Sequence, residues 1–310
     1  MDARSRQRAT VVAIAGGVIV LSVVVATLSL RGAPRARGPA DATPTRIVSL
    51  APSLTEILFA LGRGEAVVGV TEYCDYPPEA KSKPKIGGYY NPNYEAIVAM
   101  DPDLVVMLRE HGQVVGHMEK LGLRTVRVSH NSIDGICASI ESVGRACRAS
   151  TRATELVDAI RRDVDRVRRL TAGRPRPRVI VSVGRSMGTG SIADVWAASR
   201  DTLYDEVVEI AGGANALDEK RVKYATLSQE GVMALNPDVI IDVVADIESR
   251  GATVASVKAD WSSLGEVAAV ASGRVYVLGS DYVEIPGPRV ALLVKDVARA
   301  LHPDVDWDTP

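Results

Sequence analysis

The chain has 310 residues, of which 46% are hydrophobic and 24% charged, and its net charge is −1. This apolar content excludes an intrinsically disordered chain, and 26 Gly with 16 Pro exclude a collagen-like one. Residues 1–44 contain six Arg and two Asp, so this segment carries +4 and the remainder carries −5. Binding to phosphates needs a basic face, so we expect no nucleic-acid partner for this acidic body.

The N-terminal segment has the pattern of an export signal. Arg4, Arg6 and Arg8 precede an uncharged apolar stretch, residues 9–30. As a helix it would be about 33 Å long, enough to cross a hydrocarbon core of about 30 Å. An uncleaved membrane anchor and a cleaved signal both stay open, and a buried soluble helix is the third alternative. Either of the first two places the body outside the cytoplasm, in the periplasm or on the outer face of the cytoplasmic membrane.

Residues 31–44, rich in Pro, Gly and Arg, indicate a flexible tether, so we assign residues 1–44 to the signal or anchor and its tether. A strand is then predicted at 46–50. Ser53 and Glu56 suggest a capping box at the start of the next helix, which Gly62 ends. The elements that follow in the first lobe alternate strictly: strand 67–71, helix 94–100, strand 104–108, helix 114–121 and strand 125–128. This alternation predicts a mostly parallel sheet in a lobe spanning 45–150.

A long amphipathic helix follows, from Ser150 to about Leu170, in which apolar residues recur at three- and four-residue steps. We take 151–173 as a bridging helix and 174–310 as a second α/β lobe, opened by a strand at 179–183. The Cys137 and Cys147 thiols lie ten residues apart in a helical run and would be about 15 Å apart, so we expect no disulfide between them.

Two segments of the chain resemble each other. Residues 95–106 and 230–241 both run from a Glu through a helix and a Pro-Asp turn into a buried strand. The repeat favours two related lobes. Two unrelated helix–strand units that share a Pro-Asp turn remain the alternative.

Taken together, an ordered set of motifs resembles the cobalamin-binding branch of the periplasmic substrate-binding proteins of ABC importers. The set comprises Arg46-Ile-Val-Ser-Leu-Ala-Pro-Ser-Leu-Thr-Glu56, Gly69-Val-Thr71 running into Cys74-Asp-Tyr-Pro-Pro78, Asn93-Tyr-Glu95, Asp101-Pro-Asp-Leu-Val105, Leu227-Ser-Gln-Glu230, Ser280-Asp-Tyr282 and Pro288-Arg289. The resemblance implies an α/β fold of two Rossmann-like lobes, with mostly parallel sheets, joined by one long helix. It also implies a receptor without a resident cofactor that catalyses no reaction, and a monomer is expected. A single joining helix should allow only a small opening between the lobes.

The resemblance places the ligand in a cleft between the lobes, at loops that follow the strands. Aromatic residues make only 4% of the chain, yet five of the nine Tyr lie between residues 73 and 94. Tyr rings offer rigid area with a polar tip, which suits a corrin or a porphyrin. Cobalamin is the first expectation, with haem or a ferric siderophore as alternatives. The expected cleft residues are Tyr73, Cys74, Tyr89, Tyr90, Arg109, His111, Ser186, Met187, Trp196 and Tyr282.

Glu95 and Glu230 match the family's paired surface glutamates, one in each lobe. The resemblance implies that they dock on arginines of the importer permease, as charge-assisted pairing would allow. The alternative is that each carboxylate only complements the dipole of its own helix.

Two other kinds of chemistry are alternatives to a binding protein. Gly184-Arg-Ser-Met-Gly188 has the G-x-S-x-G form of a nucleophile elbow, so a serine hydrolase using Ser186 is an alternative. Asp242 or Asp281 and then His302 would complete its triad in the required order. His111 and His117 would not share a helix face, and with His130 they are too dispersed for a metal site, so no metal bound directly by the protein is expected.

Overall fold

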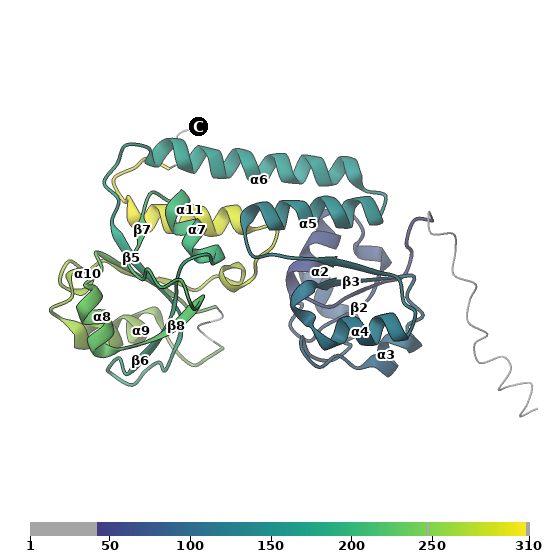
Figure 1. The fold of residues 1–310 in the computed structure, drawn as a ribbon, viewed down its shortest axis with the longest axis horizontal. Coiled ribbons are helices and arrows are strands. Elements are labelled where there is room, and N and C mark those ends of the chain that lie inside the picture. Colours follow the sequence, from purple (N-terminus) through teal and green to yellow (C-terminus); the bar gives the residue numbers. More distant parts are fainter. Residues whose placement is uncertain (1–41, 246, 248, 308–310) are drawn as a thin grey trace, which may run out of the picture. The chain divides into compact units, whose positions relative to one another are not determined.

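The computed structural model describes residues 42–245, 247 and 249–307 (Figure 1). Within this part of the chain, no helix is both long enough and apolar enough to cross a membrane. The anchor or signal predicted for residues 9–30 lies outside the described residues.

The N-lobe, residues 45–149, is built on a parallel sheet in the strand order β2-β1-β3-β4. Its strands are β1 (Ile47–Ser49), β2 (Val67–Val70), β3 (Leu104–Leu108) and β4 (Thr125–Val128). Its helices are α2 (Pro52–Ala60), α3 (Tyr94–Ala99), α4 (Gln113–Lys120) and α5 (Ile133–Ala146). All five residues of β3 are buried, as expected for a central strand covered on both faces.

The capping box predicted for α2 is wrong. The helix begins at Pro52 with Ala51 as its N-cap and no side-chain cap, because Pro suits the first helical position. Ser53 and Glu56 are therefore inside the helix, where both are buried. Their side chains bond to other parts of the molecule, which contributes to the site described below.

The long helix α6 (Ser150–Thr171) packs on α5 of the N-lobe and on α11 of the C-lobe, as Figure 1 shows. Its buried residues recur at three- and four-residue steps, among them Val157, Ile160 and Val164. The predicted amphipathic bridge is confirmed. Cys74, Cys137 and Cys147 are all free and buried, which confirms that the last two do not pair.

The C-lobe, residues 172–307, contains a mixed sheet in the order β10-β9-β5-β6-β8, with β7 also paired to β5. Its strands are β5 (Arg178–Arg185), β6 (Asp194–Ala198), β7 (Ala214–Asn215), β8 (Tyr224–Ser228), β9 (Val239–Val243) and β10 (Val275–Leu278). Its helices are α7 (Leu203–Ile210), α8 (Gln229–Leu235), α9 (Val254–Trp261), α10 (Ala268–Ala271) and α11 (Val290–Leu301). The α/β fold with a long joining helix is confirmed, but the second sheet is less parallel than predicted.

The antiparallel part of this sheet is an addition at one end of β5. The first residues of β5 pair with β7 and β9 in parallel, as β1 pairs with β2 and β3 in the N-lobe. The last residues, from Ser182 to Arg185, pair antiparallel with β6, which in turn pairs antiparallel with β8. The strand predicted at 179–183 is shorter than β5, because the prediction did not include the last residues of β5, which pair with β6.

The internal repeat is confirmed in structural detail. The sequence of buried, intermediate and exposed residues is identical from 94 to 108 and from 229 to 243. Asp101 and Asn236 occupy equivalent turns, and both have positive φ, 45° and 39°. Each lobe therefore contains the same helix–turn–strand unit.

The same anchors hold both copies of the unit. The carboxylate of Asp103 accepts hydrogen bonds from the backbone N–H groups of Thr45 and Arg46, and that of Asp238 accepts one from the N–H of Arg178. The guanidinium groups of Arg46 and Arg178 donate to carbonyls at the ends of α3 and α8. These bonds fix each short helix against the first strand of its own lobe.

Candidate functional site

A cleft of about 620 Å³ lies between the N-lobe and the C-lobe. This size is typical of a pocket for a small molecule. Its lining residues are Tyr90, His130, Asn131, Val183, Trp196, Asp201, Thr202, Leu203, Tyr204, Lys223, Tyr224, Val283, Glu284, Ile285, Pro286 and Leu293. Only Asp201 and Glu284 add negative charge and only Lys223 adds positive charge, so the lining has little net charge.

The antiparallel addition supplies the aromatic wall of the cleft. Val195 and Ala197 of β6 face the core, while Trp196 between them is 55% exposed. Its indole lies beside its register partner Gly184, where an added Cβ would be in ordinary van der Waals contact with the ring at 3.6 Å. Tyr224 of β8 lies beside it, with ring centroids 6.0 Å apart. The alternation of the two strands thus presents two rings on one side of the sheet.

The N-lobe contributes Tyr90, which is 77% exposed. Tyr89 packs behind it, edge-on to Tyr90 at 4.6 Å between centroids and against His111 at 4.5 Å. His111 is buried, and its Nδ1 accepts the backbone N–H of Leu108. Burial lowers the pKa of His111, so this ring is a neutral support for the Tyr89–Tyr90 turn.

His130 is a buried member of the lining that follows strand β4. Its Nδ1 lies 3.0 Å from the hydroxyl oxygen of Ser53, the residue displaced from the predicted helix cap. Burial lowers the pKa of His130 to about 4, against the opposing effects of the Glu110 carboxylate and the Pro286 carbonyl. The imidazole is therefore neutral at physiological pH.

This neutral imidazole predicts an acid-dependent loss of stability. Between pH 6.5 and 4 the unfolded chain binds a proton at His130 that the folded chain refuses, so stability falls as the pH falls through this window. The loss should approach 3 kcal/mol at pH 4, from about 1.4 kcal/mol for each unit of pKa shift. Urea unfolding at pH 7, 5.5 and 4.5 measures it.

In that experiment, His130→Gln should flatten the pH dependence. The matched control is His117→Gln on the exposed face of α4, which should retain the wild-type slope. Equal slopes for the wild type and His130→Gln would contradict a neutral, buried His130.

A largely buried ion pair joins the two lobes. Arg289 of the C-lobe donates from Nε and Nη2 to the two carboxylate oxygens of Glu56 in α2, at 2.9 and 2.6 Å. Its Nη1 also bonds both oxygens of Asp281. The guanidinium lies 3.8 Å from the ring centroid of Tyr76 and 5.4 Å from that of Tyr282. Sequence analysis missed this cluster, because Glu56 was assigned to a helix cap.

Burial and pairing act in opposite directions on this cluster. Desolvation raises the pKa of Glu56, although Arg289 opposes the shift. Desolvation also disfavours the charge on Arg289, but the bonds to Glu56 and Asp281 outweigh it and raise the Arg289 pKa.

A second bond between the lobes runs from the Ile133 backbone N–H, at the start of α5, to the Glu206 carboxylate in α7, at 2.8 Å.

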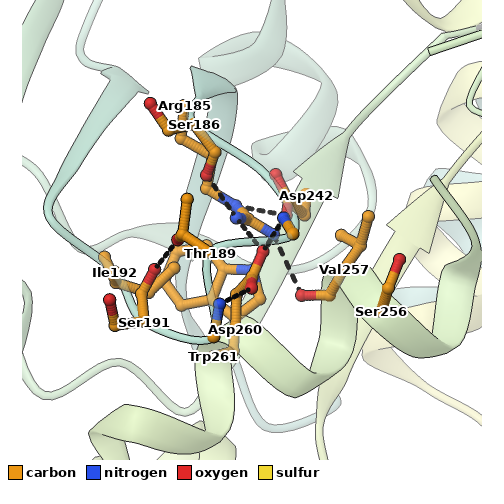
Figure 2. A network of polar contacts seen from close by, with 12 residues as sticks. Arg185, Ser186, Thr189, Ser191, Ile192, Asp242, Ser256, Val257, Asp260 and Trp261 are labelled. Atoms are coloured by element: carbon orange, nitrogen blue, oxygen red, sulfur yellow. Dashed lines mark hydrogen bonds and ion pairs between the residues drawn. The ribbon is translucent and has the colours of Figure 1, made fainter. Parts of the chain in front are cut away.

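A second buried network fixes the loop between β5 and β6 (Figure 2). Arg185 donates from Nε to Asp242 at 2.9 Å and from Nη1 to Asp260 at 2.8 Å, and all three side chains are about 1% exposed. Asp260 also accepts the backbone N–H groups of Gly188 and Gly190, at 2.8 and 2.7 Å. Burial raises the pKa of Asp260, but these bonds outweigh it and leave the pKa below its usual value.

The same loop does not support the serine hydrolase. Ser186 is exposed, and His302 is buried elsewhere, near Thr171 and Gly212. The Gly188 and Gly190 N–H groups both bond to the Asp260 carboxylate, which fixes the backbone of this loop. The structure does not bring Ser186 and His302 together, and the G-x-S-x-G segment is the end of β5 and the start of a loop held by the Asp260 carboxylate.

Other predicted cleft residues are placed as follows. Cys74 is in the core of the N-lobe, with its sulfur 3.2 Å from the Thr55 hydroxyl. Tyr73 and Arg109 are exposed, Met187 is partly buried, and Tyr282 donates its hydroxyl to Asp296 at 2.6 Å. The structure thus places Tyr90 and Trp196 in the cleft lining, with Tyr89 packed against Tyr90 and His111 packed against Tyr89.

Several lining residues were missed by the sequence analysis, namely His130 as a cleft residue, Asn131, Tyr204, Lys223 and Tyr224. The alternation of exposed and half-buried residues in β8 could have revealed Tyr224. Tyr204 carries no such signal, because it reaches the cleft from inside α7, where its hydroxyl donates to the Val283 carbonyl. In the described chain, no three His, Cys, Asp or Glu side chains are grouped to hold a metal ion.

Glu95 and Glu230 both occupy the second position of their helices, α3 and α8, and both are exposed. The preceding caps are alike, since Asn93 and Ser228 accept backbone N–H groups of the first turn. Backbone and Ser228 hydrogen bonds lower the pKa of Glu230, so this carboxylate is charged at neutral pH.

Residues 47–282 match the family described as Periplasmic binding protein. The chain is 29% identical over 269 residues to the Uncharacterized ABC transporter substrate-binding lipoprotein YvrC of Bacillus subtilis (strain 168), covering 84% of this chain and 81% of that protein. It is 28% identical over 265 residues to the Vitamin B12-binding protein of Pectobacterium carotovorum subsp. carotovorum (strain PC1), covering 84% and 90%. The periplasmic heme-binding protein RhuT from Roseiflexus sp. RS-1, in apo form, has a similar structure, with a TM-score of 0.71, 29% identity and coverage of 84% and 99%.

Proposed function

The chain belongs to the periplasmic binding protein family, whose members bind substrates rather than transform them, and on this basis we propose that it is an extracytoplasmic receptor for a metal chelate, most specifically cobalamin. It captures the ligand in the cleft between the lobes and delivers it to the permease of an ABC importer. The aromatic cleft, whose three charged side chains leave little net charge, is the observation that carries this proposal.

The chemistry of the lining supports cobalamin over its two alternatives. Haem carries two propionates and most ferric siderophores are anionic, so both favour cationic side chains. Lys223 is the cationic member of the lining, opposed by Asp201 and Glu284. The edge of a corrin is mainly amides, which pair well with neutral donors and acceptors such as Asn131, Thr202 and the tyrosine hydroxyls. Trp196 and Tyr224 offer ring faces for its apolar part.

An absorbance titration of the purified full chain with cobalamin, haemin and a ferric siderophore tests the ligand. Saturable binding of cobalamin alone is the expected result. Saturable binding of haemin or of the siderophore would identify that compound as the ligand in place of cobalamin and would still support the receptor function. Silence with all three would overturn the proposed function.

Trp196→Ala should weaken ligand binding by about 30-fold or more, because a central aromatic residue of a binding site is commonly worth about 2 kcal/mol or more. The dissociation constant from the same titration measures the effect. Leu292→Ala is the matched control, since Leu292 is an exposed apolar residue of α11 outside the cleft. Unchanged affinity in Trp196→Ala would show that the ligand does not bind against the aromatic wall.

The remaining assignments complete the proposal. Residues 1–44 act as an export signal or membrane anchor with its tether, 45–150 and 174–310 as the two lobes, and 151–173 as the bridge. The receptor works as a monomer. Glu95 and Glu230 dock on the permease, and their charge and exposure support this role. An anchored sensor that binds the same ligand without any permease is the alternative, and ligand uptake by cells carrying Glu95→Lys and Glu230→Lys separates the two.

A further inference from the structure

Each docking helix exposes an apolar side chain at the same position. Val98 in α3 is 48% exposed, and Met233 in α8 is 40% exposed. The two residues are equivalent in the internal repeat, three positions after Glu95 and Glu230 respectively. Scattered exposed apolar residues are ordinary on a protein surface. Here, however, the exposure recurs at matching places in two copies of one structural unit.

The local geometry puts each apolar side chain beside its carboxylate. Residues three apart in a helix share a face, so Val98 lies on the face of Glu95 and Met233 on that of Glu230. Ile97 and Val232, which precede them, are fully buried and fix the rotation of the two helices. Neither glutamate forms an ion pair with another residue of the described chain. Figure 1 shows α3 and α8 in their respective lobes, both on the side away from α6.

We propose that Glu95 with Val98 and Glu230 with Met233 form two equivalent docking patches, each a charged and an apolar contact. This inference rests on the proposed function, and it adds the apolar half of the contact. The partner that fits is a membrane protein of two identical copies, each with a cationic side chain beside a small apolar depression. Two equal patches on one chain match such a pair, because each copy can make the same contact.

The two halves of a patch should have different kinetic roles. Exposed charges steer association and make its rate depend on salt, whereas buried apolar contacts slow dissociation. The flexible side chain of Met233 can adapt to the same depression that receives the smaller Val98. Removing the apolar atoms should therefore change the dissociation rate and leave the salt dependence of association unchanged.

Photo-crosslinking identifies the partner first. The full chain, with a benzophenone amino acid at position 98 or at position 233, is irradiated in native membranes and its adducts are identified by mass spectrometry. Both positions should label the same membrane polypeptide. That polypeptide, purified in nanodiscs, is then used to measure association and dissociation rates with Val98→Ala, Met233→Ala and the matched control Leu292→Ala.

Val98→Ala removes two methyl groups, and Met233→Ala removes a methylene, the sulfur and a methyl group. Each variant should dissociate about 4- to 15-fold faster, as expected for losing one or two groups buried in the contact at about 0.8 kcal/mol each. The control should dissociate at the wild-type rate. The inference is overturned if the two positions label different proteins or none, or if both variants dissociate like the wild type. Glu95→Gln and Glu230→Gln, together with the ligand titration, distinguish a failure of this inference from a failure of the proposed receptor function. If the glutamine variants associate more slowly while the alanine variants dissociate like the wild type, the proposed receptor function is supported and the apolar contacts are contradicted. If the chain binds none of the three ligands, the proposed function itself is contradicted.

Discussion

Arg289→Ala is expected to lower the free energy of unfolding by about 3–5 kcal/mol, the usual effect of removing one partner from a buried ion pair. The variant leaves the Glu56 carboxylate buried without its cation, and it removes the guanidinium from the face of Tyr76. The Glu56 pKa is already raised by desolvation and should rise further in the variant. The folded variant then binds a proton more readily than the unfolded chain, so the deficit should shrink as the pH falls toward 5.

Urea unfolding at pH 7.5 and at pH 5 measures both effects. Arg127→Ala is the matched control, since Arg127 pairs with Glu119 at 2.9 Å on the exposed surface and should lose no more than about 1 kcal/mol. A loss in Arg289→Ala no larger than that of the control would show that the pair between the lobes contributes little. Solution scattering of Arg289→Ala also tests the small opening expected between the lobes. The Arg289–Glu56 pair, helix α6 and the hydrogen bond from Ile133 to Glu206 all connect the two lobes and so limit this opening.

Arg185→Ala should destabilise the C-lobe by a comparable amount, about 3–5 kcal/mol or more. Arg185 is the cation between two buried carboxylates, so its removal leaves Asp242 and Asp260 uncompensated. Trp261 reports on the change directly, because its indole N–H donates to Asp242 at 2.8 Å. Ligand affinity should fall as well, since the loop that Asp260 holds leads into β6 and the aromatic wall.

Urea unfolding followed by tryptophan fluorescence measures the stability, and the ligand titration measures the affinity. Arg200→Ala removes an exposed pair with Asp218 in the same lobe and should be nearly neutral in both measurements. Asp260→Asn separates the loss of stability from the loss of ligand affinity. In this variant Arg185 keeps Asp242 as its partner, while the loop between β5 and β6 loses part of its support. If Arg185→Ala unfolds like the control, the network in Figure 2 is not what stabilises the C-lobe.

Much of the N-lobe could be predicted because its signals are local. Each strand is a short apolar run, each helix has its own periodicity, and the connections between successive strands are long enough to keep them parallel. The C-lobe departs from the prediction where a short loop turns β5 back into β6. That loop was interpreted from its G-x-S-x-G letters, which gave no indication that Asp260, some seventy residues later, accepts its backbone N–H groups.

The cleft was predictable only in outline. Tyr90 and Trp196 were expected there from the family resemblance, which places the ligand at loops after the strands, and both line the cleft. Trp196 does so from within strand β6, not from a loop. Cys74 fell in such a loop too, but its side chain turned into the core. The direction of a side chain in a loop depends on backbone angles that sequence patterns do not report.

Sequence patterns alone established the alternation of strands and helices, the bridging helix and the repeat that relates the two lobes. These features depend on periodicity over a few residues and on hydrophobic burial, which each segment carries within itself. The pairing of Glu56 with Arg289, 233 residues apart, depended on how the lobes pack together, as did the burial of His130 beside Ser53. Such contacts arise from long-range packing, and their energies depend on burial, which no local pattern contains.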